Sequence, residues 1–179
     1  MKRGFKTMAK ELALEVRREI DLGADVPFEP HALAKLYGIQ VLRISDLGLS
    51  ATESTAFSGA LIATGTGQLI VENDSHSPAR CKMTVSHEMS HVVLEHSFST
   101  LIVDSAGCRD LIGDQEGEAA FLAGELVLPS DAAIQLAFRN ATDEEVALHF
   151  GISVEAARWR MNVSGARVIA SRARAKRAS

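Results

Sequence analysis

The chain has 179 residues, of which 46% are hydrophobic and 23% charged, so it can bury a sizeable core as one ordinary domain or one domain with a small appendage. A net charge of −4 argues against a dedicated nucleic-acid binder, and no apolar run approaches the roughly 18 residues of a membrane span. The N-terminus lacks the uninterrupted apolar stretch of a secretory signal, and two cysteines do not make a disulfide framework in a chain of this size. We therefore expect a protein of the reducing cytoplasm with no membrane partner.

The first part of the chain predicts two helices and three strands. Apolar residues recur at four-residue steps over residues 6–22, which predicts an amphipathic helix. Its expected buried stripe is Met8, Leu12, Val16 and Ile20. A second helix is expected over 30–37, ended by Gly38. Strands are predicted at 39–44, 57–63 and 68–72, the last two as a hairpin, and the last strand could offer an edge to an extended peptide.

The rest of the chain predicts helices separated by short turns. Ser77 can cap a helix that has Pro78 at its first position and runs to about residue 96. A loop over 97–113 should lead to a helix capped by Asp114. The remaining expected helices are 115–126, a short one from 130, one to 150 that starts with a capping box at Thr142, and 154–162.

The run His87-Glu88-Met89-Ser90-His91 lies inside the first of these helices and has the spacing of a metal site. Four residues make slightly more than one helical turn, so both histidines project from one face and can bind a single zinc ion. Glu88 is rotated by about 100° from His87, which puts it beside the metal. From there it can act as the catalytic base that accepts a proton from water.

A hydrolytic zinc site needs a third protein ligand, and the residues alone do not choose it. The helix over 115–126 offers Glu116, Glu118 and Glu125 among small and apolar neighbours, where an inward-facing carboxylate must be paired or metal-bound. Glu116 and Glu118 point about 200° apart on a helix, so both cannot face one ion. His96 is half a turn away from His87 if the helix continues, so we interpret it as a helix-end histidine or a group lining the cleft.

The residues around these motifs resemble the ImmA/IrrE family of metallopeptidases. The resemblance is carried by 81–96 around the two histidines and by 118–129, a Glu-Ala-x-x helix that ends in Leu-Val-Leu-Pro, and it extends over most of 28–165. It implies zinc bound by His87, His91 and Glu118, and a zincin-like fold. Ala120 departs from the family pattern, which often has a polar residue there. The resemblance also implies an endopeptidase that cleaves a transcriptional repressor, often of the XRE type, in stress or mobile-element regulation.

Residues 142–165 predict a helix, a glycine turn and a second helix, a spacing that suits a helix-turn-helix. Arginines on the second helix and after it would suit DNA contact, but bulky Trp159 and Met161 interrupt a hydrophilic recognition face. We therefore favour docking of a protein substrate over nucleic-acid binding. The rival interpretation is a DNA- or repressor-binding regulatory module whose zinc site is structural.

The sequence therefore predicts an α+β fold. A zincin-like metallopeptidase domain over 1–130 should hold a small, mostly antiparallel sheet packed on the helix of His87 and His91. A helix-turn-helix-like subdomain over 131–165 and a basic flexible tail over 166–179 should follow.

Overall fold

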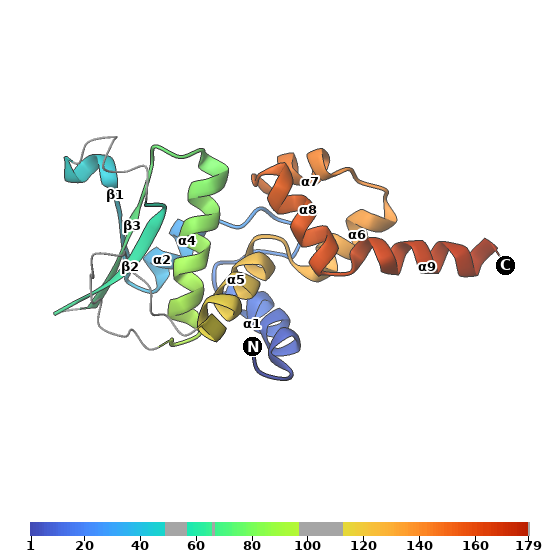
Figure 1. Ribbon diagram of the computed structural model, residues 1–179, viewed down its shortest axis with the longest axis horizontal. Helices are drawn as coiled ribbons and strands as arrows, with labels where there is room; N and C mark the ends of the chain where they lie inside the picture. Colours follow the sequence, from blue (N-terminus) through green and yellow to red (C-terminus); the bar gives the residue numbers. More distant parts are fainter. Residues whose placement is uncertain (49–56, 66, 97–112, 179) are drawn as a thin grey trace.

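The computed structural model describes residues 1–48, 57–65, 67–96 and 113–178 (Figure 1). The fold is α+β and mostly helical, with one small sheet at one end of the molecule and a long terminal helix at the other. The elements of the first half are α1 (Phe5–Glu19), α2 (Pro30–Leu36), β1 (Gln40–Arg43), the short 3-10 helix η1 (Ile44–Leu47), β2 (Gly59–Thr64) and β3 (Gly67–Glu72). Those of the second half are α4 (Pro78–Val93), α5 (Gly113–Val127), α6 (Ser130–Phe138), α7 (Asp143–Phe150), α8 (Val154–Val163) and α9 (Ala166–Ala178).

The sheet is mixed, with strand order β1-β3-β2. The β2–β3 hairpin is antiparallel, as the sequence predicts, whereas β1 joins the other side of β3 in parallel. The expectation of a mostly antiparallel sheet is therefore correct only for the hairpin. Because β3 is the central strand, its edges are both occupied and cannot receive a peptide, and the prediction of an edge at 68–72 is wrong. In β3, Ile70 and Val71 are both buried, as expected for a strand covered on two faces.

Helix α1 forms where predicted but buries a different stripe. The buried apolar residues are Phe5, Ala9, Ala13 and Val16. Met8 is 42% exposed, so the expected stripe was wrong by about one position at its start. Small alanines allow α1 to pack closely on α5. Because alanine is only weakly hydrophobic, the larger apolar side chains determined the predicted stripe, and the buried alanines were not part of it. The guanidinium of Arg17 is also buried and donates hydrogen bonds to the backbone carbonyls of Leu126, Gly23 and Val26.

Helix α4 lies between the sheet and α5 (Figure 1). Its buried side includes Val85 and Met89, and α5 contributes Leu122 and Leu126 to the same core. The helix begins as predicted, with Ser77 as its cap, but ends at Val93, three residues earlier than expected. The interface between α4 and α5 is the frame on which the candidate site is built.

The helices α6 to α9 form the other end of the molecule. The capping box at Thr142 is present, and Gly151 has a φ of 63°, which ends α7 and starts the predicted turn. Residues 166–178 form α9, where the sequence predicts a flexible tail. The helix packs on α6, and Arg174 donates to the carbonyl oxygen of Ala137 at 2.6 Å. Its many alanines and arginines are good helix formers. The prediction of a flexible tail relied on the basic charge of the segment and not on this helix propensity.

Among the described residues, no single helix is both long enough and apolar enough to cross a membrane. The bent pair α5 and α6 would meet the length and composition criteria together, across a 52° break. Both helices supply residues to the hydrophobic core, for example Leu126 and Ala133.

Candidate metal centre

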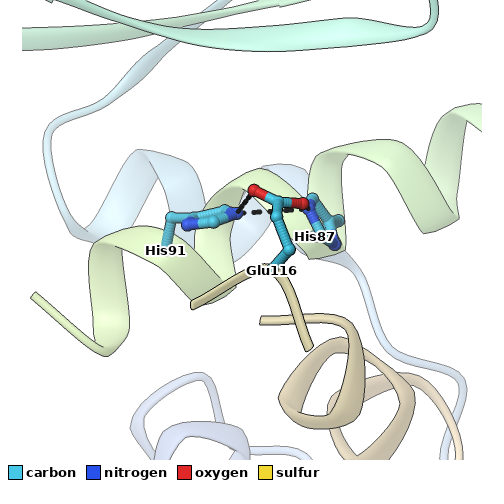
Figure 2. Close-up of side chains that lie close together, drawn as sticks. All are labelled: His87, His91 and Glu116. Carbon is cyan, nitrogen blue, oxygen red and sulfur yellow. Dashed lines mark hydrogen bonds and ion pairs between the residues drawn. The ribbon is translucent and has the colours of Figure 1, made fainter. Parts of the chain in front are cut away.

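Two adjacent helices bring the site residues together. His87 and His91 lie one turn apart on α4, and their ring centroids are 4.9 Å apart. Glu116, in the first turn of α5, reaches across the helix interface and places its carboxylate between them, as Figure 2 shows. The two helices pack along their length, so the positions of all three side chains are set by the core beneath them.

The three side chains form a compact group of possible metal ligands. Glu116 Oε2 lies 3.2 Å from His87 Nε2, and Glu116 Oε1 lies 3.2 Å from His91 Nε2. The two Nε2 atoms are themselves 3.2 Å apart (Figure 2). One nitrogen or oxygen from each residue lies within 4.8 Å of the others, and this is a group that could hold a metal ion. The group is accessible from one side, because the side chain of His91 is 3% exposed but that of Glu116 is 43% exposed.

The chemistry of this group fits a metal ion better than it fits a hydrogen-bonded cluster. Glu116 Oε1 is buried and has no hydrogen-bond partner of acceptable geometry among the described residues, despite its short distance to His91. A buried carboxylate oxygen without a partner is costly. Burial and then the neighbouring His87 hold the pKa of His91 well below its usual value, so the ring is neutral at pH 7. Neutral imidazole is the form that binds a metal.

Glu88 lies beside this group on α4. Burial, followed by the negative charge of Glu116, raises the pKa of Glu88 to about 7, while a hydrogen bond from the backbone N–H of Leu61 opposes the rise. A carboxyl group with a pKa near 7 can both accept and release a proton at neutral pH. Leu61 belongs to β2, so this edge strand of the sheet contacts the Glu88 carboxylate.

The other two candidate ligands of α5 have different partners. Glu118, the ligand that the family resemblance implies, lies with Oε2 at 3.7 Å from His96 Nε2, and its Oε1 accepts a hydrogen bond from the backbone N–H of Lys2 at 3.2 Å. Glu125 lies further along the helix, where its Oε1 is 2.9 Å from Arg160 Nη2. Of the three carboxylates left open by the sequence, Glu116 is the one that the fold places against both histidines.

Three further residues, Tyr37, His96 and His149, have side chains that could stabilise a tetrahedral oxyanion, and each makes a contact of its own in the structure. His96 packs behind His91, with the two Nδ1 atoms 3.0 Å apart. The hydroxyl of Tyr37 donates to the Glu19 carboxylate at 3.0 Å, and His149 Nε2 lies 2.7 Å from the carbonyl oxygen of Asp25. Tyr37 and His149 are therefore occupied by contacts outside the group formed by His87, His91 and Glu116.

A cavity of about 340 Å³ opens beside His87 and Glu88. Its other lining residues come from β2 and the segment before it, from α4, from α5 and from α8: Ser58, Gly59, Met83, Thr84, Ala120, Ala123 and Trp159. Sequence reasoning missed this contribution of Trp159, because nothing in the pattern of α8 shows that its ring lies beside Gly124 of α5 at the cavity. Gly59 is a residue from which the sequence could have indicated a close approach of two segments at this cavity. A Cβ at this position would clash with the Thr84 side chain and lie 3.1 Å from the Val71 carbonyl oxygen.

Comparison with known proteins assigns the chain to a family. The family model described as the IrrE N-terminal-like domain, a peptidase family, matches residues 34–162, which include the two histidines, Glu88, the three candidate ligands of α5 (Glu116, Glu118 and Glu125) and Trp159. No curated protein is similar enough to the chain to count as a match. The matched range covers most of the chain and all of the candidate site, and we conclude that the protein belongs to the ImmA/IrrE family of peptidases.

Proposed function

We propose that the protein is a zinc-dependent endopeptidase that hydrolyses a peptide bond in a protein substrate. The observation that carries this proposal is the Glu116 carboxylate, which lies 3.2 Å from the Nε2 atoms of both His87 and His91. Two imidazoles and one carboxylate are a common ligand set of catalytic zinc, with a fourth position left for the reacting groups. A zinc ion held there supplies a Lewis acid that polarises the carbonyl of the scissile bond.

We propose Glu116 as the third ligand, in place of the Glu118 that the resemblance implies. Glu116 faces both histidines, whereas Glu118 faces His96 on the far side of His91. On a helix, two residues separated by two positions point in nearly opposite directions, so a rotation that brought Glu118 to the histidines would withdraw Glu116. The packing of α5 on α4 makes such a rotation costly, because Leu122 and Leu126 would leave the core.

Glu88 takes the role of proton carrier in this proposal. Its carboxylate accepts a proton from the attacking water and releases it to the amine that leaves. Burial favours this exchange because it raises the pKa of the group to about 7. The N–H of Leu61 donates to the carboxylate and orients it, and the negative charge of Glu116 raises the pKa of Glu88 further.

The cavity beside Glu88 favours an extended peptide with an apolar side chain as the substrate. Met83, Ala120, Ala123 and Trp159 make most of its wall apolar. Strand β2 pairs only with β3 among the described strands, so its second edge is one place where a peptide could add as a further strand. A transcriptional repressor of the XRE type remains the substrate class implied by the resemblance, in stress or mobile-element regulation.

A DNA- or repressor-binding module with a structural zinc site is the second candidate. The described arginines of the C-terminal helices argue against direct DNA contact, because several are engaged within the protein. Arg158 and Arg167 both pair with Asp143, and Arg160 is buried. Glu88 also argues for the enzyme, because a structural zinc site has no use for a buried acid beside its ligands.

The first experiment measures metal content by mass spectrometry on protein purified without a histidine tag. Wild type, Glu116→Ala and Glu118→Ala are compared after reconstitution with zinc. We expect about one zinc per chain in wild type, retention in Glu118→Ala, and loss in Glu116→Ala. Loss in Glu118→Ala with retention in Glu116→Ala would return the ligand to Glu118. Absence of zinc from the wild type would refute the metal site and favour the binding module.

A further inference from the structure

The end of α4 has an unusual residue at a position that normally takes glycine. Glu95 has a φ of 50°, in the left-handed region, and donates its N–H to the Val92 carbonyl at 3.0 Å, while His96 donates its N–H to the His91 carbonyl at 3.0 Å. This pair of hydrogen bonds is a Schellman motif, in which the chain turns back over the last helical turn. The left-handed conformation is strained for a residue other than glycine.

The motif places His96 directly over His91. In most Schellman motifs, an apolar contact joins these two positions. Here two imidazoles meet instead, with their Nδ1 atoms 3.0 Å apart and their rings nearly perpendicular at 68°. His96 is 9% exposed, so water cannot readily replace either partner.

The proton positions in this contact follow from the metal site. The Nε2 atom of His91 is the one that faces Glu116 and His87, so a metal ion would take its lone pair. The Nδ1 atom of His91 must then carry the proton and donate it to His96 Nδ1. His96 therefore carries its own proton on Nε2, which faces Glu118 Oε2 at 3.7 Å. This distance is longer than an ordinary hydrogen bond, and the carboxylate acts chiefly through its charge.

We propose that His96 is a positioning residue that fixes the ring of His91, and that Glu118 fixes His96 from behind. The series Glu118, His96 and His91 rests on the proposed metal site and adds a function for two buried polar residues that the mechanism does not use. Glu118 is itself held by the N–H of Lys2 at 3.2 Å, so each member of the series has a partner on the side away from the metal. His96 is not a member of the ligand group and its role is indirect.

The inference is tested by measuring zinc affinity on the intact chain, through competition with a chromophoric chelator. His96→Phe keeps the ring volume but removes the acceptor, and we expect zinc binding to weaken by about 10–100-fold. His96→Asn restores an acceptor close to the place of Nδ1 and should recover most of the affinity. His149→Phe is the matched control, because His149 contacts the Asp25 carbonyl oxygen and should leave affinity unchanged.

Two spectroscopic readouts separate positioning from general destabilisation. The ligand-field spectrum of the cobalt-substituted protein should shift in His96→Phe and return in His96→Asn. Nitrogen NMR of the zinc-loaded wild type should show His91 protonated at Nδ1 and His96 protonated at Nε2. A proton on His96 Nδ1 would overturn the proposal even if His96→Phe failed to fold.

The other outcomes also decide between the two proposals. Wild-type zinc affinity and an unchanged cobalt spectrum in folded His96→Phe would overturn the positioning role and leave the metal site intact. Loss of all metal in Glu118→Gln would make Glu118 a ligand and overturn its role behind His96. A wild-type protein that binds neither zinc nor cobalt would overturn the metal site and this inference together.

Discussion

The buried ion pair between Glu125 and Arg160 should make a large contribution to folding that depends on both partners. Arg160 Nη2 lies 2.9 Å from Glu125 Oε1, and both side chains are 1% exposed. Arg160 also donates through Nη2 and Nε to the Leu128 carbonyl oxygen, at 2.8 and 3.1 Å. Glu125 accepts two further hydrogen bonds, from the N–H and the hydroxyl of Ser130. The pair therefore joins α5, the start of α6 and α8.

Arg160→Met replaces the cation with an apolar side chain of similar length and leaves Glu125 buried without a counterion. Breaking a buried pair in this way costs about 3–5 kcal/mol, a large part of a typical total stability of about 5–15 kcal/mol. Glu125→Gln leaves the arginine uncompensated instead. The double variant removes both charges, so its loss should be smaller than the sum of the two single losses by about 2 kcal/mol or more.

The assay is urea unfolding followed by far-ultraviolet circular dichroism, with the free energy of unfolding compared across the cycle. Arg158→Met is the matched control on the same helix, because Arg158 is 59% exposed and pairs with Asp143 at the surface. An exposed pair of this kind contributes about 1 kcal/mol or less, and added salt weakens it. A loss in Arg160→Met no larger than in Arg158→Met, or strictly additive losses in the cycle, would refute the reasoning.

Three further predictions can be tested by substitution. Glu88→Gln should retain zinc yet lower cleavage of a peptide library, read by mass spectrometry, by about 10²–10⁴-fold, and equal cleavage would remove its role as base. Gly124→Ala should lower the melting temperature, because its Cβ would lie 2.8 Å from side chains of α8, whereas Gly117→Ala, with only one contact at 3.9 Å, should be neutral or stabilising. Thr142→Ala removes the capping box of α7 and should cost about 1 kcal/mol in urea unfolding, and an unchanged midpoint would contradict that assignment.

Local signals predicted most of the elements but not their partners. Ser77 and Pro78, Gly38 and the capping box at Thr142 act within a few residues of themselves, and each is found where expected. The parallel pairing of β1 with β3 depends on contacts between distant residues, and period-two alternation carries no information about strand order.

The candidate site shows the same contrast between local signals, which were predictable, and contacts between distant residues, which were not. The spacing of His87 and His91 places them on one helical face whatever surrounds the helix, so the pair was predictable. The choice between Glu116 and Glu118 depends on how α5 is rotated against α4, and both residues sit among small and apolar neighbours in the sequence. The contact between His96 and His91 was not predicted, because the predicted helix continued through Glu95. The left-handed conformation at this position is usually marked by a glycine in the sequence, and here the residue is a glutamate.

The boundary predicted at residue 130 falls between residues that line one cavity and between residues that form one buried ion pair. Trp159 lines the cavity beside His87 and Glu88, although it lies in the segment expected to be a separate subdomain. Arg160, the next residue, neutralises Glu125 on the helix that carries Glu116. A chain ending at residue 130 would lose one wall of the cavity and leave a buried acid on α5 unpaired. The C-terminal helices are therefore part of the structure that positions the third proposed ligand, and a substrate docked on them would contact the same packed unit as the candidate metal centre.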